Sequence, residues 1–361
     1  MKITKLTGLL LTYFAFLVKA EDPVLVILGG SDNDYYSLNT SLIVGLQNDY
    51  ECNIGDLPDR TFGAIGGMIG SQMIYCGGRF GVLTTTDDCS YYDPDSNLWI
   101  ESDSEHDMQA SRYFAGYANT DHGLLVTGGY HSNGLCARNT AEYLSKANGK
   151  WEYLPNVPFY SYGSCLVELN TTHTLRIGGY PETECTVMSD PTNRVLAFNW
   201  DTKEWSEIEP MKENRLSAMC ARLNDGKVIV TGGSSVHKLK STEIYDPLTQ
   251  TWTSGPDLPL YWSQGKLVSY GDGALLVNGF TQTDPDDQDS SKAEDTILLF
   301  EYNEWIEFPK KLPHPRANAV VFVADGDSLA KNCKITRNSS SKLQTFLSVI
   351  LFSLTSLLLT K

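Results

Sequence analysis

Two histidines, His131 and His237, have the best prospects for chemistry in this sequence. Each follows a glycine pair at the end of a short apolar run, so the two could face the same side of a repeated structure. A neutral imidazole is the commonest metal ligand among side chains and also exchanges protons near neutral pH. The remaining histidines are scattered without a motif spacing, so surface histidines are the default interpretation.

Arginine recurs at a regular place as well. Arg60, Arg112, Arg215 and Arg316 each follow a proline or methionine corner, at the start of an expected strand. A guanidinium group can bind a carboxylate through paired hydrogen bonds. Recurrence at one place in a repeat nevertheless indicates a structural role for these four residues.

The sequence contains no Gly-x-Ser-x-Gly nucleophile motif, no phosphate-binding glycine loop and no His-Glu-x-x-His metal motif. The acidic stretch Asp284–Asp295 lacks the spacing of a calcium loop and is interpreted as a solvated loop. The net charge of −16 repels nucleic acid. We therefore expect no cofactor, no metal, no catalytic residue and no nucleic-acid partner.

The elements that would position such residues form a repeat of about fifty residues, a period typical of stacked units. Short apolar runs end in glycine pairs at Gly29-Gly30, Gly77-Gly78, Gly128-Gly129, Gly178-Gly179 and Gly232-Gly233. The sixth run ends in Gly279-Phe280. We expect the glycines to end the second strand of each unit, where a missing Cβ permits positive φ and close backbone approach.

Each unit also carries an aromatic residue, a turn and then a tryptophan. The tryptophans are Trp99, Trp151, Trp205, Trp252 and Trp305, and Cys52 stands at the corresponding place in the first unit. Asp, Asn, Gly and Pro between the two aromatic residues favour tight turns. Four short strands per unit are typical of an antiparallel blade, and radial packing of such blades buries both faces of each.

This pattern resembles the Kelch repeat family, and the best copy is the segment 224–252, from Asn-Asp-Gly-Lys-Val-Ile-Val-Thr-Gly-Gly to Tyr-Asp-Pro-Leu-Thr-Gln-Thr-Trp. The resemblance covers about residues 24–327 and implies an all-β, six-bladed propeller. The first unit lacks a first strand, and the last unit is followed by an extra strand at 315–323. We expect this C-terminal strand to complete the first blade and close the ring.

The family resemblance also defines two enzymatic alternatives. Some Kelch-like oxidases hold copper with two histidines and two tyrosines, which His131 and His237 could in part supply, although the further domains and seventh blade of those enzymes are missing here. Six-bladed sialidases use an arginine triad and Asp boxes, and Ser31-Asp32-Asn33-Asp34 does not continue into such a box. A sugar oxidase or glycosidase with an axial site is thus the second hypothesis.

The ends of the chain read as targeting signals. Residues 1–20 have the charged start and apolar core of a signal peptide. The predicted domains are then the propeller at 21–328, a polar stalk at 329–344 and a hydrophobic tail at 345–361. The tail indicates a glycosylphosphatidylinositol signal with Asn338 or Ser339 as the attachment residue, or else a short membrane anchor. We expect an extracellular, cell-surface and lipid-anchored glycoprotein, with a secreted form as the alternative.

Eight cysteines favour disulfides in an exported protein. They are Cys52, Cys76, Cys89, Cys136, Cys165, Cys185, Cys220 and Cys333. Two pairings are conceivable: Cys76 with Cys89 across a hairpin, and Cys165 with Cys220 between adjacent blades. Sequons at Asn39 and Asn170 lie in expected loops and predict glycans.

The favoured function is non-catalytic recognition of an extracellular protein or glycan, and a structural role in a matrix or surface coat is a third hypothesis. Loops on a rigid scaffold carry function. The loops at 130–138, 180–193 and 281–295 vary most in length. We therefore expect these loops to form the contact surface. The oligomeric state is left open.

Overall fold

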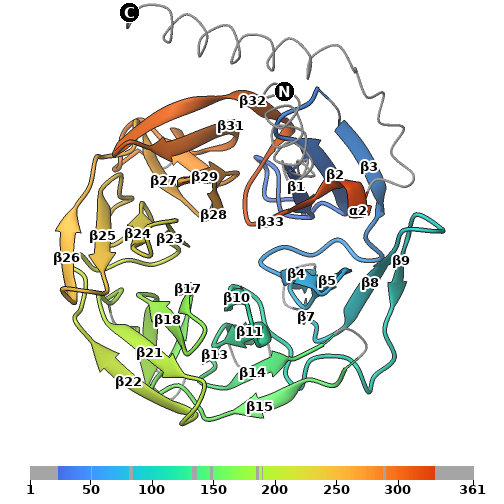
Figure 1. Cartoon of the computed structure of the whole chain (residues 1–361), viewed down its shortest axis with the longest axis horizontal. Helices are drawn as coiled ribbons and strands as arrows, with labels where there is room; N and C mark the ends of the chain where they lie inside the picture. The colour runs from blue at the N-terminus through green and yellow to red at the C-terminus, as the bar shows by residue number, and fades with distance from the viewer. Residues whose placement is uncertain are drawn as a thin grey trace, which may run out of the picture.

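The computed structural model describes residues 23–49, 51–80, 84–131, 136–146, 149–183, 187–188, 190–287 and 290–329. These residues form six antiparallel blades arranged around a central axis (Figure 1). The prediction of an all-β, six-bladed propeller is confirmed. The segments predicted as signal peptide and hydrophobic tail, and nearly all of the predicted stalk, lie outside the described residues, as do Cys185, Cys333, Asn338 and Ser339.

Each blade has four main strands, which follow one another from the axis outward. Blades 1 to 3 contain β33 (Val320–Asp325), β1 (Pro23–Leu28), β2 (Thr40–Gly45) and β3 (Glu51–Asp56); β4 (Ile65–Ile69), β5 (Gln72–Cys76), β8 (Cys89–Asp93) and β9 (Leu98–Glu101); and β10 (Gly116–Thr120), β11 (Gly123–Thr127), β14 (Ala141–Leu144) and β15 (Glu152–Leu154). Blades 4 to 6 contain β17 (Cys165–Asn170), β18 (His173–Ile177), β21 (Val195–Asn199) and β22 (Glu204–Ile208); β23 (Met219–Arg222), β24 (Val228–Thr231), β25 (Thr242–Asp246) and β26 (Thr251–Ser254); and β28 (Lys266–Tyr270), β29 (Gly273–Val277), β31 (Lys292–Glu301) and β32 (Glu304–Arg316).

Shorter strands extend the loops between these elements. They are β6 (Arg79–Phe80) with β7 (Thr84–Thr85), β12 (Tyr130–His131) with β13 (Cys136–Ala137), β16 (Tyr160–Tyr162) with β19 (Tyr180–Thr183) and β20 (Val187–Met188), and β27 (Tyr261–Ser263) with β30 (Phe280–Gln282). One short helix, α2 (Gly326–Leu329), follows β33.

The ring closes in blade 1, where β33 pairs antiparallel with β1 from Pro23 opposite Asp325 to Leu28 opposite Val320. Two further backbone hydrogen bonds join Ser31 and Ala317, at 2.8 and 2.9 Å. The predicted closure by the last strand is therefore confirmed. Pairing of the two ends of the propeller leaves no unpaired inner strand in this blade.

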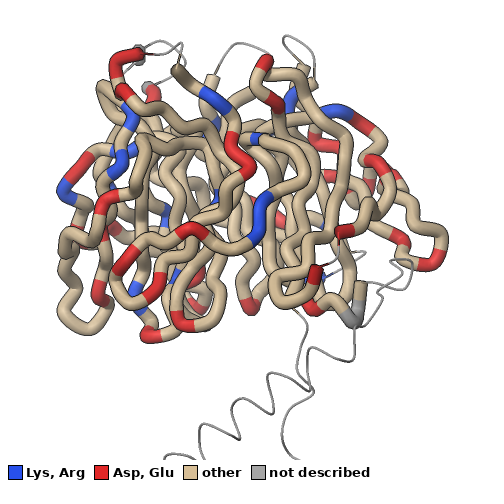
Figure 2. The backbone as a smooth tube through the Cα atoms, turned by 90° about the horizontal axis from the view of Figure 1, so that it is seen from above, with Lys and Arg blue, Asp and Glu red and all other residues tan. Residues whose placement is uncertain are grey.

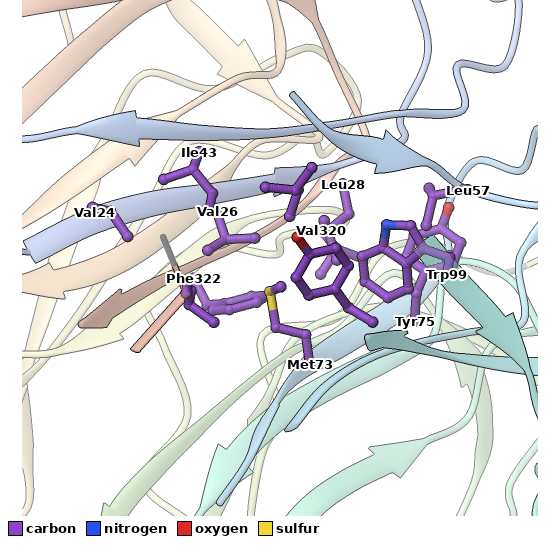
Figure 3. Packing of buried hydrophobic residues seen from close by; sticks show 14 residues of the cluster. Val24, Val26, Leu28, Ile43, Leu57, Met73, Tyr75, Trp99, Val320 and Phe322 are labelled. Carbon is purple, nitrogen blue, oxygen red and sulfur yellow. The ribbon is translucent and has the colours of Figure 1, made fainter. Parts of the chain in front are cut away.

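The core lies between blades. Figure 3 shows one such layer, in which Val24 and Val320 of blade 1 face Met73 and Trp99 of blade 2. Strands β1 and β5 are buried along almost their whole length, and successive side chains point to opposite faces, so each strand contributes to the core on both sides of its blade. Burial of these faces is the main favourable term in the stability of the ring.

The tryptophans of the outer strands fix neighbouring blades to each other. Trp205 and Trp252 donate their indole N–H to the backbone oxygens of Pro155 and Glu209, at 2.9 and 2.8 Å, in the link that precedes their own blade. In blades 2, 4, 5 and 6 the tryptophan lies directly opposite its aromatic partner, as in Tyr245 with Trp252. Blade 3 differs, because Glu152 rather than Trp151 is opposite Tyr143.

The glycine pairs end the second strands and have positive φ throughout, as at Gly232 (59°) and Gly233 (86°). A Cβ on Gly232 would lie 2.3 Å from the carbonyl oxygen of Trp262 in the next link, so close backbone contact requires glycine there. In blade 6 the sequence interpretation was one residue out of register. Asn278 (52°) and Gly279 (115°) occupy the two positions, because asparagine tolerates this left-handed conformation, and Phe280 begins β30.

The structure joins Cys76 to Cys89, and Cys165 to Cys220, by disulfides. The first closes the hairpin of β5 and β8, and the second connects the inner strands of blades 4 and 5. These are the two pairings that the sequence suggested. Cys52 and Cys136 are also disulfide-bonded.

Candidate functional site

The antiparallel order of each blade places two kinds of connection on one face of the disc. These are the loops after the second strands and the links that lead into the next blade; we call this side the loop face. The tight turns within the strand pairs lie on the opposite side, the turn face. Asp and Glu are distributed over the whole propeller (Figure 2), in keeping with 44 acidic against 28 basic residues in the chain.

Backbone hydrogen bonds around the axis connect the six links on the loop face. Each link contains one residue with positive φ, and five of these donate their N–H to the carbonyl of the preceding one, at 2.7 to 3.2 Å. In order around the ring the six are Gly63, Phe114, Gly163, Ser217, Gln264 and Asn318. Three of these side chains are polar and lie in blades 5, 6 and 1, so the two halves of the ring differ in polarity.

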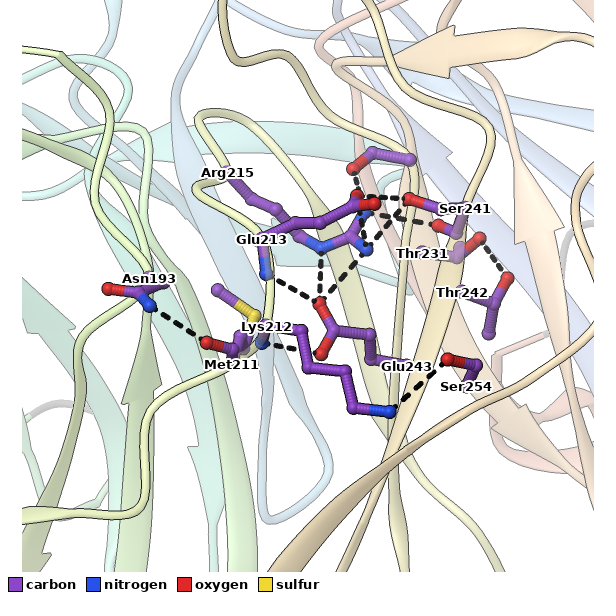
Figure 4. Close-up of polar contacts among 11 residues, drawn as sticks. Asn193, Met211, Lys212, Glu213, Arg215, Thr231, Ser241, Thr242, Glu243 and Ser254 are labelled. Atoms are coloured by element: carbon purple, nitrogen blue, oxygen red, sulfur yellow. Dashed lines mark hydrogen bonds and ion pairs between the residues drawn. The ribbon is translucent and has the colours of Figure 1, made fainter.

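Buried arginines support the loops of this face. Arg215 is fully buried and donates to the carbonyls of Gly232 and Ser241, at 2.9 and 3.0 Å, and to the carboxylate of Glu243 at 3.1 Å (Figure 4). Arg112 repeats this arrangement in blade 3 with the carbonyl of Gly128 and the carboxylate of Glu142. The guanidinium groups thus hold backbone in place, and their remaining surface is inaccessible to a substrate.

The fourth arginine in the predicted series does not belong to it. Arg60 is exposed, and the buried Thr61 takes the position of Arg112 and Arg215 in the repeat. Arg316 does occupy this position and donates to the carbonyl of Gly29 at 3.1 Å. Leu42 stands where Glu243 stands in blade 5, and burial lowers the pKa of Arg316 to about 10.

A continuous series of aromatic rings covers the loop face over blades 2 to 4. Neighbouring ring centroids lie 5.0 to 6.2 Å apart, and all but one of the rings are partly exposed. We call this series the aromatic tract; it comprises Phe62, Tyr113, Phe114, Tyr130, Tyr162 and Tyr180. Rings at such distances in tilted, edge-to-face and stacked arrangements stabilise one another. The tract is therefore a rigid apolar surface with hydroxyl groups.

Charged groups lie at the ends of the tract. The guanidinium of Arg79 lies 5.7 Å from the ring centroid of Phe62, a cation–π contact. Burial, and then the carboxylate of Glu182, raises the pKa of Tyr130. Burial also raises the pKa of Tyr162, with a smaller effect from Tyr180. These phenols stay neutral at physiological pH and can both donate and accept hydrogen bonds.

The sequence contained a signal for the tract that motif searching missed. Tyr130 and Tyr180 each follow a glycine pair directly, and both begin loops that we expected to form the contact surface. Tyr113 and Tyr162 precede the inner strands of blades 3 and 4. Only the folded ring brings these four tyrosines together, because each contact between two of them joins a residue in a loop to a residue in a link.

A channel along the axis opens between the links. On the loop-face side it contains a small cavity of about 90 Å³, lined by Phe114, Ser217, Gln264 and Asn318 among others. On the turn-face side a cavity of about 420 Å³ is lined by residues of the inner strands. Tyr117, Leu166 and Lys266 line both, so they mark the place where the two cavities meet.

His131 and His237 have different partners. The ring of His131 lies 3.3 Å from the hydroxyl of Ser111, and burial, then Arg138, lowers its pKa. Nδ1 of His237 lies 2.7 Å from a carboxylate oxygen of Asp286, within the acidic stretch of blade 6. Across the described part of the chain, no group of three or more His, Cys, Asp or Glu side chains is arranged to hold a metal ion.

The two predicted glycosylation residues lie near strand ends. Asn170 is exposed at the end of β17, and its side-chain oxygen accepts hydrogen bonds from the backbone of Thr172 and His173, at 3.0 and 2.9 Å. Asn39 is partly exposed, just before β2. Whether either carries a glycan stays a prediction.

Comparison with known proteins gives a consistent family assignment. A family model described as Kelch motif matches residues 215–259, which include the best copy of the repeat. Spermatocyte protein spe-26 of Caenorhabditis elegans is 24% identical over 64% of this chain and 39% of its own length. Kelch-like protein 23 of Homo sapiens is 27% identical over 52% of this chain and 31% of its own length. This chain thus spans less than half the length of these curated relatives.

A solved structure of YjhT shares the fold. It superposes with a TM-score of 0.63 and 13% sequence identity, over 79% of this chain and 97% of that one. At this level of identity the likeness concerns the fold alone.

The relatives contradict the predicted location. We expected an extracellular, lipid-anchored protein, but the Kelch-like relatives are mainly intracellular proteins. Within the described ranges, no helix is long and apolar enough to cross a membrane. The prediction depended on apolar composition at residues 1–20 and 345–361, and composition alone does not show that a segment directs export.

Proposed function

The chain is a Kelch-repeat propeller, and we propose on this premise that it is a non-catalytic scaffold that binds a protein partner through the aromatic tract of its loop face. The proposal rests on one observation: six neighbouring rings form a partly exposed surface across blades 2 to 4. Kelch propellers generally act in protein binding, which supports a role of this kind.

The composition of the tract suits protein recognition. Tyrosine is enriched among the residues that dominate binding energy, because it combines a large apolar area with a hydroxyl group and few rotatable bonds. The rings of Tyr130 and Tyr162 lie 5.0 Å apart at the centre of the series. We expect these two rings to contribute most of the affinity.

The rest of the loop face suits a scaffold rather than an enzyme. Its buried arginines are bound to backbone carbonyls and glutamates, as Arg215 is to Gly232 and Glu243. His131 contacts Ser111 and His237 contacts Asp286, and neither histidine belongs to a group that could hold a metal ion within the described ranges. These contacts assign the polar groups of the face to positioning the loops.

The test compares two double variants of the purified chain in quantitative capture of partners from lysate. Tyr130→Ala with Tyr162→Ala alters the tract, whereas Leu248→Ser with Tyr302→Ser alters two apolar residues, 93% and 87% exposed, in turns of the turn face. We expect partners that the wild type and the control retain and the tract variant loses. For a purified partner, the tract variant should bind at least about 30-fold more weakly, the equivalent of roughly 2 kcal/mol.

Two results would overturn the proposal. One is a partner held equally by the wild type and the tract variant, which would place recognition elsewhere on the propeller. The other is tract-dependent binding to a glycan array without any protein partner, which would replace a protein by a carbohydrate as the ligand.

A further inference from the structure

Lys266 is a charged residue at a position that is otherwise uncharged. It is the second residue after the positive-φ residue of its link, and in the other five blades this position holds Ile65, Gly116, Cys165, Met219 and Val320. The position begins each inner strand, and Lys266 itself lines both axial cavities. A lysine at this place puts one amine into the middle of the channel.

The surroundings of this amine are unusual for a lysine. Nζ of Lys266 lies 3.8 Å from the ring centroid of Tyr117, on the inner strand of blade 3. Within the described residues, Nζ has no ion pair and no hydrogen bond. Several other lysines are paired with carboxylates, such as Lys150 with Glu105 at 2.7 Å and Lys227 with Asp225 at 2.7 Å. No protein group among the described residues therefore occupies Nζ of Lys266 by a hydrogen bond or an ion pair.

Two effects on the charge of Lys266 oppose each other. Enclosure by the channel wall lowers its pKa to about 8, because the ammonium is poorly solvated there. The face of the Tyr117 ring favours the ammonium. The other titratable or charged groups that line the larger cavity are Glu168 and Arg222. Arg222 is exposed, and Glu168 accepts a hydrogen bond from the backbone of Asp121 at 2.8 Å.

Small molecules have room beside the amine. The turn-face cavity of about 420 Å³ includes Lys266 in its lining, and the side chain is partly accessible within it. Cavities of about 300 Å³ or more accommodate small organic ligands. The loop-face side is narrower, at about 90 Å³.

We propose that Nζ of Lys266 is a site of covalent modification by small aldehydes, which enter the axial channel from the turn face and form an imine. The lone pair of the neutral amine attacks the carbonyl carbon and forms the C–N bond. The carbonyl oxygen takes up a proton, and the carbinolamine then loses one water molecule, which contains that oxygen and both protons of the amine. Nothing is oxidised or reduced. This site does not depend on the function proposed for the aromatic tract.

Lys203 provides a matched comparison within the same chain. Its Nζ also lies over an aromatic ring, 4.8 Å from that of Trp200, but on the outer surface. At pH 7, an amine with a pKa of about 8 is neutral in about one molecule in ten, against about one in three thousand for an ordinary pKa of 10.5. Lower nucleophilicity and restricted access reduce this advantage, and we expect Lys266 to react at least about tenfold faster than Lys203.

The experiment treats the full chain with propanal and cyanoborohydride, which traps each imine as a stable alkylamine, and quantifies every lysine by peptide mass spectrometry. The rate at Lys266 should level off near pH 8. Lys203→Met should leave the rate at Lys266 unchanged. A polymeric aldehyde too large for the channel should modify Lys203 and spare Lys266. Equal rates at the two lysines with propanal, or modification of Lys266 by the polymer, would overturn the proposal, and both measurements use the wild-type chain.

Discussion

Substitution of Glu243 by leucine tests whether the buried arginine of blade 5 needs its carboxylate. Glu243 is 3% exposed, and its oxygens accept hydrogen bonds from the backbone N–H groups of Lys212 and Glu213, at 2.7 and 3.2 Å. They also accept from Nε and Nη2 of Arg215, at 3.4 and 3.1 Å. Leucine would remove the negative charge and all four acceptor contacts, while it retains much of the side-chain volume.

The structure determines how large the effect should be. Removal of one partner from a buried ion pair costs about 3–5 kcal/mol, because the other charge stays buried without compensation. Arg215 would retain the carbonyls of Gly232 and Ser241, and the partly exposed carboxylate of Glu213 at 3.1 Å. Blade 1 contains the same arrangement naturally, with Leu42 at the corresponding place. We therefore expect a loss near the lower end, about 3 kcal/mol in the free energy of unfolding.

The assay is equilibrium unfolding in urea, followed by tryptophan fluorescence. Glu207→Leu is the matched control, because Glu207 pairs with Arg194 in an exposed ion pair and should cost less than about 1 kcal/mol. In combination with Arg215→Met, the Glu243→Leu substitution should add less than it does alone, by at least about 1 kcal/mol. A loss below about 1 kcal/mol for Glu243→Leu, or strict additivity in the double variant, would refute the reasoning.

Three further predictions follow from buried or partly buried groups. Asn278→Gly should raise the free energy of unfolding, measured in urea, by about 1 kcal/mol. The reasons are that Asn278 has φ 52° and that its side-chain oxygen and nitrogen are buried without a hydrogen-bond partner among the described residues. A loss of stability would contradict this prediction. Replacement of Cys165 and Cys220 by serine should cost about 4 kcal/mol by loop entropy for a separation of 55 residues, and an unchanged unfolding midpoint would contradict it. The pKa of His131 lies below its ordinary 6.5 because of burial and then Arg138, so the contribution of His131 to stability is complete above about pH 6.5 and is lost as the pH falls. His131→Gln should therefore make the free energy of unfolding less dependent on pH between about pH 7.5 and 5.5. An identical slope in the variant and the wild type would contradict this prediction.

The fold could be predicted because its signals repeat. One glycine pair or one tryptophan carries little information, but six copies in register specify blades, and the missing first strand specifies how the ring closes. The errors occurred where a local substitution was compatible with the same geometry. Asn278 replaces a glycine because asparagine tolerates positive φ. Arg60 was assigned to the arginine series although the structure places Thr61 there, one residue along.

The candidate site was less predictable, for a physical reason. The tract arises from contacts between a loop of one blade and a link of the next, as between Tyr130 and Tyr162, and such contacts leave no spacing pattern in the chain. In the sequence, each of these tyrosines by itself looks like the aromatic residues of the core, such as Tyr245. Lys266 was missed because its significance depends on alignment with five other inner strands, and that alignment needs the positive-φ residues to fix the register.

A closed ring of repeated blades provides an internal standard for function. Positions that only hold the ring together should conserve their chemistry around it, and the second glycine position, Gly233 in blade 5 and Gly279 in blade 6, does so. Positions that depart from their equivalents are either tolerated exceptions or sites. Phe114 lies across the axial opening from Gln264 and Asn318, although all three have the same backbone conformation and the same role in the hydrogen-bonded ring. Since the backbone role does not require these side chains, the single aromatic ring of Phe114, which belongs to the aromatic tract, supports the proposal that a partner approaches off-centre, over blades 2 to 4.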